Sequence, residues 1–359
     1  MCSSDLSSLP TFGLVSESAK LNLNTASFDQ LMILPTMTQT IAGSIVDWRD
    51  SDSTPSSGGA ENETYLALPE PYYAKNSSLE TIDEMLLING ITQEWLFGDG
   101  TAAPLGTSTV RRTTGTLLAT DHWVSSGVAE LLTVYSVESN SGASGGQRVA
   151  LNPPNQRGPL RNLLRQQLGQ SRGDQVATAI GNAPLVDVFD MYFRANMTVD
   201  ELRKIIDQVS TTATSQRSRG RINVNLAPRE VLACLSGLES TDVDQLLSRR
   251  PSSSSTISND ITWVVEALDR KAIGLADRIT GKSQQFSADI LALSPDARAF
   301  KRVRIVIDTS GTSPKVIYRS DRSRLGWPMD PLVLATMRAN GSVASGSTSM
   351  FREIGRAHV

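Results

Sequence analysis

The feature that most constrains the fold is a stretch of sequence that occurs twice at a constant offset. Residues 20–51 read KLNLNTASFDQLMILPTMTQTIAGSIVDWRDS, and residues 221–252, which lie 201 positions later, read RINVNLAPREVLACLSGLESTDVDQLLSRRPS without a gap. The positions that keep the same residue include Asn22 and Asn223, Asn24 and Asn225, Leu31 and Leu232, and Arg49 and Arg250. Chance similarity seldom keeps one register for so long, so the repeat predicts one structural unit that is used twice.

Within each copy, the pattern predicts a short extended segment followed by two helices. In the first copy, residues 20–24 alternate apolar and polar side chains, Ser27 suits a helix N-cap, and Pro35 ends that helix. The next helix has a stripe of apolar residues at helical spacing, namely Ile41, Ile45 and Trp48. Two short helices joined by a tight turn form a helix-hairpin-helix (SAM-like) module, in which we expect Trp48 to be buried.

The rest of the chain predicts further helices and then a small sheet. Residues 158–210 contain three stretches with apolar residues at helical spacing, and a further helix is expected just after residue 260. Beyond residue 284, three stretches alternate apolar and polar residues, and they predict a three-stranded antiparallel meander with one solvated face. In the middle stretch the residues expected on one face are Val303, Ile305 and Ile307. The predicted fold class is therefore α+β, with a helical body that carries two helix-hairpin-helix modules and ends in a small antiparallel sheet.

Both ends of the chain are expected to be foreign to the protein. The start, MCSSDL, and the end, EIGRAHV, are explained by back-translation into a common sequencing-adapter sequence, so we expect the native chain to extend further at both ends. The predicted organisation is a start with an adapter-derived scar (1–15), a first SAM-like module (16–140), a linker (141–157), a second helical module (158–280), an antiparallel sheet (281–327) and a tail that ends in a scar (328–359).

Composition excludes several kinds of active site. The net charge is −3 and the pI is about 5.6, which argues against a nucleic-acid binder. Outside the terminal scars, only Cys234 and His122 remain of their residue types, so a histidine-based catalytic triad or a Cys/His zinc site is not expected. Cys234 lies on the apolar side of the second repeat, which predicts a buried, inert thiol.

The loop after the first repeat is the one place where metal ligands gather. Asp50, Asp52, Glu61 and Glu63 flank a Gly-Gly pair, and calcium prefers several carboxylate and carbonyl oxygens on a flexible loop. The spacing is not that of an EF-hand, so a solvated polar loop is the alternative. Asp47, Asp50 and Glu61 also allow a paired-carboxylate hydrolase, although nothing else in the sequence supports one, and we expect no enzyme. The aromatic segment that follows is expected to pack onto the first module through Tyr65, Leu66, Tyr72 and Tyr73.

An ordered series of motifs carries a family resemblance. KLNLNTAS, VDWRDSD, GGAENETYLALPEPYYAKN, SLETIDEMLLINGIT, GRINVNLAPREVLACL and TGKSQQFSADILALS follow one another along the chain. In this order, over about residues 16–327, the chain resembles the type II secretion system protein K family. No single motif would suffice, because DNA-binding competence proteins share NLNTA.

The resemblance implies a minor pseudopilin of the inner membrane and periplasm. Such a protein has an N-terminal membrane helix, a pilin-like sheet and an inserted helical domain, and members of the family look like calcium binders. It caps the tip of a pseudopilus together with proteins that resemble proteins I and J, and it promotes assembly of the pseudopilus for protein export. The membrane helix is absent from this sequence, which we attribute to truncation at the scar, and this fragment is expected in the periplasm.

The alternative function is a helix-hairpin-helix DNA-binding protein of the competence type. In that use a glycine-rich hairpin brings backbone N–H groups to a phosphate, and nearby basic residues neutralise its charge. The two hairpins here, PTMT and SGLES, contain no lysine or arginine, and only the second contains a glycine. We therefore do not expect nucleic acid as a partner.

Overall fold

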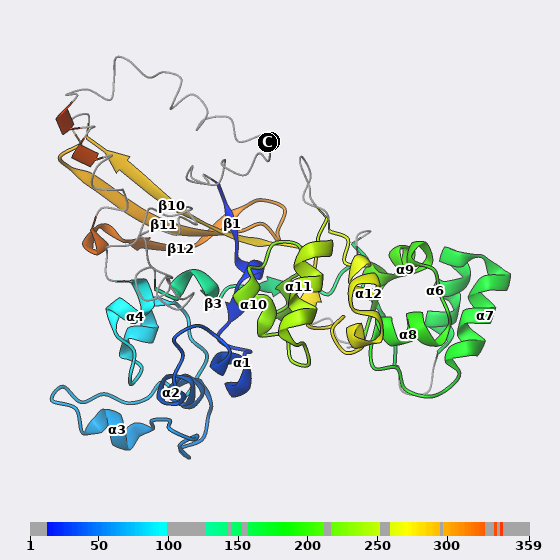
Figure 1. Cartoon of the computed structure of the whole chain (residues 1–359), viewed down its shortest axis with the longest axis horizontal. Helices are drawn as coiled ribbons and strands as arrows, with labels where there is room; N and C mark the ends of the chain where they lie inside the picture. The colour runs from blue at the N-terminus through cyan, green and yellow to red at the C-terminus, as the bar shows by residue number, and fades with distance from the viewer. Residues whose placement is uncertain are drawn as a thin grey trace. The chain divides into compact units, whose positions relative to one another are not determined.

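The structure is a computed structural model of the chain. It describes residues 13–98, 127–142, 145–152, 157–211, 217–251, 259–294 and 297–326, together with residues 334, 335, 338 and 339 (Figure 1). His122, nearly all of the predicted start at 1–15 and most of the predicted tail at 328–359 lie outside these ranges. Helices and a small antiparallel sheet are both present, so the predicted α+β class is confirmed. None of the described helices combines the length and apolar character that crossing a membrane requires.

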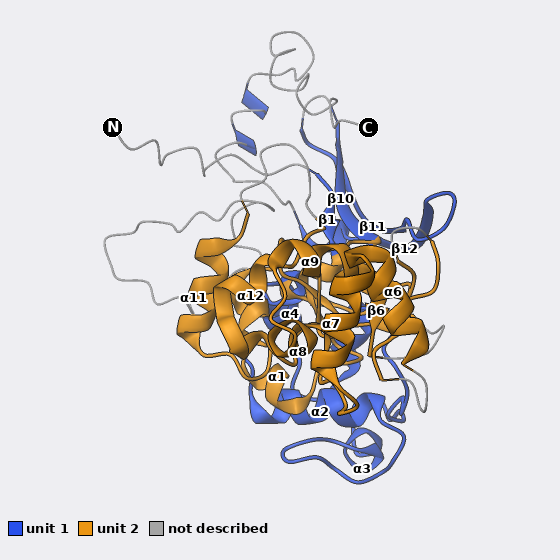
Figure 2. Cartoon of the chain, turned by 90° about the vertical axis from the view of Figure 1, so that its right-hand side faces the viewer, with its two compact units in different colours: residues 1–16, 35–130, 285–359 blue, residues 17–34, 131–284 orange. Residues whose placement is uncertain are grey.

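The chain divides into two compact units, each made of segments that are not contiguous in sequence (Figure 2). Unit 1 comprises residues 1–16, 35–130 and 285–359, and unit 2 comprises residues 17–34 and 131–284. The sequence instead predicted modules that are contiguous along the chain, and their boundaries stay a prediction. The two units are described separately below.

Unit 1 contains an antiparallel sheet whose strands come from both ends of the chain. The three predicted strands are present as β10 (Gln285–Leu293), β11 (Phe300–Asp308) and β12 (Lys315–Asp321). A fourth strand, β1 (Val15–Ser16), pairs with the start of β10, and the order is β1-β10-β11-β12. Two residues are too short for a periodic pattern, which is why the sequence did not predict β1.

The sheet does not have the simple wet face that its alternating pattern predicted. In β11 the fully buried residue is Val306, which lies on the opposite face from Val303, Ile305 and Ile307, all of which are half-buried. On the Val306 face Arg304 donates to Glu130 at 2.8 Å, so the basic residues that suggested solvent are partly covered by ion pairs. Charge pairing can replace hydration, and the alternation of residue types therefore did not reveal which face was covered.

The helical part of unit 1 lies between residues 35 and 98. It contains two helices of five residues, one helix of 11 residues and a 3-10 turn, namely α2 (Gln39–Arg49), α3 (Asn62–Leu66), η2 (Asp83–Leu87) and α4 (Gln93–Phe97). Thr38 and Thr92 accept hydrogen bonds from the backbone N–H groups of Ile41 and Trp95, which are satisfied N-caps. Trp48 is buried, as predicted.

Unit 2 is mainly helical. Its helices are α1 (Phe28–Met32), α6 (Gly158–Leu168), α7 (Gln170–Ile180), α8 (Val188–Arg194), α9 (Val199–Ile205), α10 (Arg229–Ala233), α11 (Ser240–Arg249) and α12 (Trp263–Leu268). The described residues of this unit also contain three parallel two-residue strand pairs. These are β2 (Leu21–Asn22) with β3 (Leu132–Thr133), β5 (Val149–Ala150) with β6 (Val209–Ser210), and β8 (Ile222–Asn223) with β9 (Ile279–Thr280).

The two copies of the repeat share their element order and their special backbone positions. Helices α10 and α11 begin 201 residues after α1 and α2, and the turns between them place Thr36 and Gly237 in the left-handed region, with φ of 58° and 91°. The side-chain Oδ1 atoms of Asn22 and Asn223 each accept a hydrogen bond from the backbone N–H two residues later, at 2.9 and 3.0 Å. In the first copy, α1 falls in unit 2 and α2 in unit 1, so the helix-hairpin-helix assignment stays a prediction.

Candidate metal centre

The candidate site lies at the C-terminal end of α2, where three acidic residues follow one another. Asp47 is in the last turn of the helix, Asp50 is its C-cap, and Asp52 comes just after it. The C-terminal end of a helix carries a partial negative charge and unsatisfied carbonyl groups, so it favours cations and disfavours carboxylates. Arg49, in the last turn of α2, offsets part of this repulsion, because its charge lowers the pKa of Asp50.

The loop after α2 folds back along the helix. The backbone N–H of Ser56 donates to Asp47 Oδ1 at 2.9 Å, and the N–H of Gly59 donates to the Ser56 carbonyl at 2.8 Å. The loop approaches so closely that a Cβ on Gly59 would lie 2.0 Å from Asp47 Oδ2, and one on Gly43 would lie 2.7 Å from the Gly59 nitrogen. The two glycines thus allow the loop to bring Glu61 back toward the end of α2.

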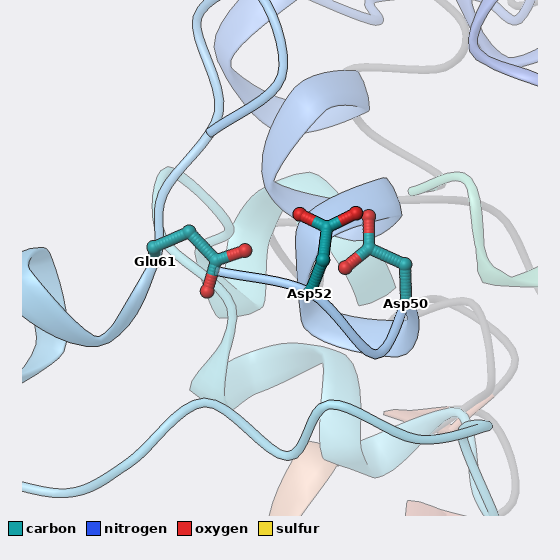
Figure 3. Close-up of side chains that lie close together, drawn as sticks. All are labelled: Asp50, Asp52 and Glu61. Atoms are coloured by element: carbon teal, nitrogen blue, oxygen red, sulfur yellow. The ribbon is translucent and has the colours of Figure 1, made fainter. Parts of the chain in front are cut away.

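Three of the four predicted ligands meet at this point. Each of Asp50, Asp52 and Glu61 offers a carboxylate oxygen, and these oxygens all lie within 4.8 Å of one another. Figure 3 shows Asp50 and Asp52 beside each other where α2 ends, with Glu61 reaching toward them from the segment before α3. Glu63 does not join them: its side chain is exposed, in the first turn of α3.

The buried oxygens of this site lack hydrogen-bond partners. Glu61 is 4% exposed, and neither its Oε1 nor its Oε2 has a partner among the residues that the structure describes. Asp50 Oδ1 and Asp47 Oδ2 are also buried without a partner within the described ranges, and Asp47 is 0% exposed. Buried polar atoms are nearly always satisfied in native proteins, so these unpartnered carboxylate oxygens make the cluster a candidate cation site.

The electrostatics of the site point the same way. Burial raises the pKa of Glu61, and repulsion from Asp47 and Asp50 raises it further. The Asn62 N–H lowers this pKa somewhat, without reaching hydrogen-bond geometry. Burial likewise raises the pKa of Asp50, with the charges of Asp52 and Asp47 adding to the effect, while the Asp52 backbone N–H and Arg49 lower it in part. A cation among these groups would reverse both shifts, because carboxylates release protons when they bind a metal.

The donor set fits a hard cation such as calcium. All available side-chain donors are carboxylate oxygens, they come from a loop and a helix end, and no histidine or cysteine is among them. Asp50, Asp52 and Glu61 would hold the ion, and Asp47 would supply additional negative charge while its other oxygen fixes Ser56. Sequence reasoning considered Asp47 only as part of a hydrolase pair. Its spacing of three residues before Asp50, within one helical turn, was the available signal.

An aromatic cluster supports the loop beyond the site. The ring of Trp48 meets the rings of Tyr65 and Tyr72 edge-on, with centroids 5.3 and 6.3 Å apart, and burial raises the pKa of Tyr65 to about 12. The predicted packing of Tyr65 and Tyr72 is therefore confirmed. The same prediction was wrong for Leu66 and Tyr73, which are exposed.

The predicted inert cysteine is also confirmed. Cys234 is buried in unit 2, its thiol donates to the Glu230 carbonyl, and burial raises its pKa to about 12. A thiol that stays protonated and inaccessible is a poor nucleophile and a poor metal ligand.

Comparison with known proteins connects the metal centre to one family. Residues 12–97 match the family model described as type II secretion system (T2SS), protein K. The type II secretion system protein K of Pectobacterium carotovorum subsp. carotovorum is 39% identical over 54 residues, which are 15% of this chain. The chain thus spans 16% of the length of this curated relative in the alignment.

A solved structure shows a weaker likeness. It is the crystal structure of the GspK-GspI-GspJ complex from the enterotoxigenic Escherichia coli type 2 secretion system, and one of its chains aligns with a TM-score of 0.40 and 14% identity. The alignment covers 86% of this chain and 78% of that chain, but a score this low does not establish a common fold. Over residues 12–97, which include the whole carboxylate cluster, the chain matches the type II secretion system protein K family, and the resemblance predicted from the sequence is confirmed for this segment.

Proposed function

We propose that this chain is part of a minor pseudopilin of a type II secretion system, with a structural role in protein export. The observation that carries the proposal is the match of residues 12–97 to protein K, because this segment contains the carboxylate cluster, the returning loop and the aromatic cluster. Those features serve to hold a surface segment in one shape. The DNA-binding alternative is not favoured by the match.

The proposed partners are other minor pseudopilins. The solved relative was crystallised as a complex named for GspK, GspI and GspJ, and we propose that this protein assembles with its own proteins I and J at the tip of the pseudopilus. We further propose that a membrane helix anchors the whole protein in the inner membrane and that the part described here lies in the periplasm. The antiparallel sheet of unit 1 is consistent with a pilin-like role.

We also propose that calcium occupies the carboxylate cluster. The support is the set of buried, unpartnered oxygens on Asp47, Asp50 and Glu61 at the negative end of α2. A divalent ion would offset the repulsion among the carboxylates and tie the loop to the helix. Its contribution is to hold the loop between α2 and α3 in one shape.

The test is co-purification of this chain with the soluble domains of the neighbouring proteins I and J, in calcium and in chelator. We expect a stoichiometric complex in calcium. Failure to form any complex, together with salt-sensitive retention on DNA, would replace the pseudopilin proposal with the DNA-binding one. A complex that forms equally in chelator, combined with no heat of calcium binding in calorimetry, would remove calcium and leave the assembly role standing.

A further inference from the structure

Four large apolar side chains are exposed on the segment that follows the metal centre. The exposed fractions are 42% for Leu66, 39% for Leu68, 71% for Tyr73 and 48% for Leu87. Single exposed apolar residues are common on protein surfaces, but a group held together on one segment is typical of an interaction site. Tyrosine and leucine side chains supply large contact areas, and tyrosine is enriched where binding energy concentrates.

Hydrogen bonds hold this group together. The Tyr72 hydroxyl donates to the Leu87 carbonyl at 2.7 Å, which places Leu87 beside the residue that precedes Tyr73. The N–H of Ala74 donates to Asn62 Oδ1 at 2.8 Å, so the chain after Tyr73 returns to the start of α3. Tyr65, the neighbour of Leu66, packs at 5.4 Å against Tyr72. The exposed side chains therefore project from a rigid base, and binding would cost little conformational entropy.

The surroundings of this group are acidic. Residues 62–87, which carry the four side chains, contain five acidic side chains and one basic side chain. The basic one, Lys75, pairs with Glu84 at 2.9 Å and with Glu80 at 3.5 Å. Glu63 and Glu70, which flank Leu66 and Leu68 in the sequence, are exposed. The excess negative charge favours a positively charged partner.

We propose that Leu66, Leu68, Tyr73 and Leu87 form a docking surface for a basic amphipathic segment of another protein. The apolar face of such a segment would cover the four side chains, and its lysines or arginines would face the surrounding glutamates. This mode of recognition combines apolar anchors with charges at the rim, which direct orientation and association rate. The surface does not depend on the proposed assembly role or on a bound metal.

The test uses a synthetic helical peptide of leucine and lysine, titrated into the protein in chelator, with a leucine and glutamate peptide of the same pattern as its counterpart. We expect the basic peptide to bind and the acidic one not to bind. Tyr73→Ala and Leu66→Ala should each weaken binding roughly 5-fold or more, which is the loss expected for an energetically important interface residue. Binding should also weaken several-fold at high salt, because rim charges are screened.

Ile317→Ala is the matched control, since Ile317 is also an exposed apolar residue of unit 1, on β12 rather than on this surface. It should bind the peptide like the wild type. Three results would overturn the proposal: equal binding of the acidic peptide, an unchanged affinity in both surface variants, or an equal loss in the control. Concentration-dependent self-association that Tyr73→Ala abolishes would instead assign the surface to a second copy of this chain. Thermal unfolding of each variant verifies that the altered surface is folded.

Discussion

Replacing Glu61 by glutamine should stabilise the metal-free protein and destabilise the calcium-bound protein relative to wild type. The side chain is 4% exposed and lies within 4.8 Å of the carboxylate oxygens of Asp50 and Asp52. Without a cation, burial and repulsion from the neighbouring carboxylates disfavour the negative charge on Glu61, and the Asn62 N–H offsets them only in part. With a cation, the same charge becomes a ligand.

The magnitude follows from the geometry. Two unit charges 4.8 Å apart repel by about 0.9 kcal/mol in a medium as polar as water. The pairs with Asp50 and Asp52 end when Glu61 becomes neutral, and so does its repulsion from Asp47, while screening of the exposed Asp52 reduces the total, so we expect a gain of about 1–2 kcal/mol in chelator. Calcium at about 100 times its Kd would add about 2.7 kcal/mol to the wild type and much less to Glu61→Gln, because the variant lacks a ligand. Glu61→Gln should therefore be more stable than the wild type in chelator and less stable than the wild type in calcium.

The assay is thermal unfolding of both proteins in chelator and in excess calcium, followed by calorimetry. The expected rise for Glu61→Gln in chelator is roughly 3–6 °C for a unit of this size. Glu63→Gln is the control, because Glu63 is exposed and outside the cluster, and it should change little in either buffer. A lower melting temperature for Glu61→Gln in chelator would show that the carboxylate has a stabilising partner and that the reasoning is wrong.

Three further predictions concern the same region. Gly59→Ala should destabilise the protein by about 1–3 kcal/mol and abolish calcium binding. The reason is that the added Cβ would lie 2.0 Å from Asp47 Oδ2. Thermal unfolding and calcium titration measure the two effects, and normal calcium affinity would contradict the proposed loop geometry. Thr36→Gly should stabilise the protein by about 0.5–1 kcal/mol, because a φ of 58° strains a β-branched residue. The second copy of the repeat has a glycine, Gly237, at this position. Chemical denaturation measures the effect, and a destabilised variant would show that Thr36 is not strained. The raised pKa values of Asp50 and Glu61 mean that the folded, metal-free protein binds more protons than the unfolded chain just above their ordinary pKa values of 3.8 and 4.5. Their contribution to the stability of the metal-free protein therefore falls as pH rises through this window, whereas calcium affinity should fall as pH decreases through it. Melting curves in chelator and calcium titrations across the acidic range measure the two trends. If the melting temperature of the wild type depended on pH in the same way as that of Glu61→Gln, the assignment would be contradicted.

Local pattern was enough to predict much of the fold and part of the site. The constant offset of the repeat predicted equivalent helices, and the alternation beyond residue 284 predicted β10, β11 and β12. Asp50, Asp52 and Glu61 were identified because acidic residues beside a Gly-Gly pair are characteristic of a cation loop. In each case the signal lies within a few residues of sequence, where helix period, strand period and turn chemistry operate.

Other features needed the tertiary structure. Strand β1 joins β10 from about 270 positions away in the chain, and a two-residue strand has no periodic pattern to reveal it. Which side of the aromatic segment is buried depends on where α2 and η2 lie, so the sequence could not tell exposed Leu66 and Tyr73 from buried Tyr65.

The candidate metal centre shows both contributions together. The sequence by itself determined that α2 ends in acidic residues and that a glycine-containing loop follows. Only the folded chain decided that Glu61 turns inward while Glu63, two residues later, faces solvent, and that Asp47 is sealed beneath the loop. The physical reason is that residue identity fixes which charges are available, whereas burial and the distances between them arise from the packing of segments that are separate in sequence.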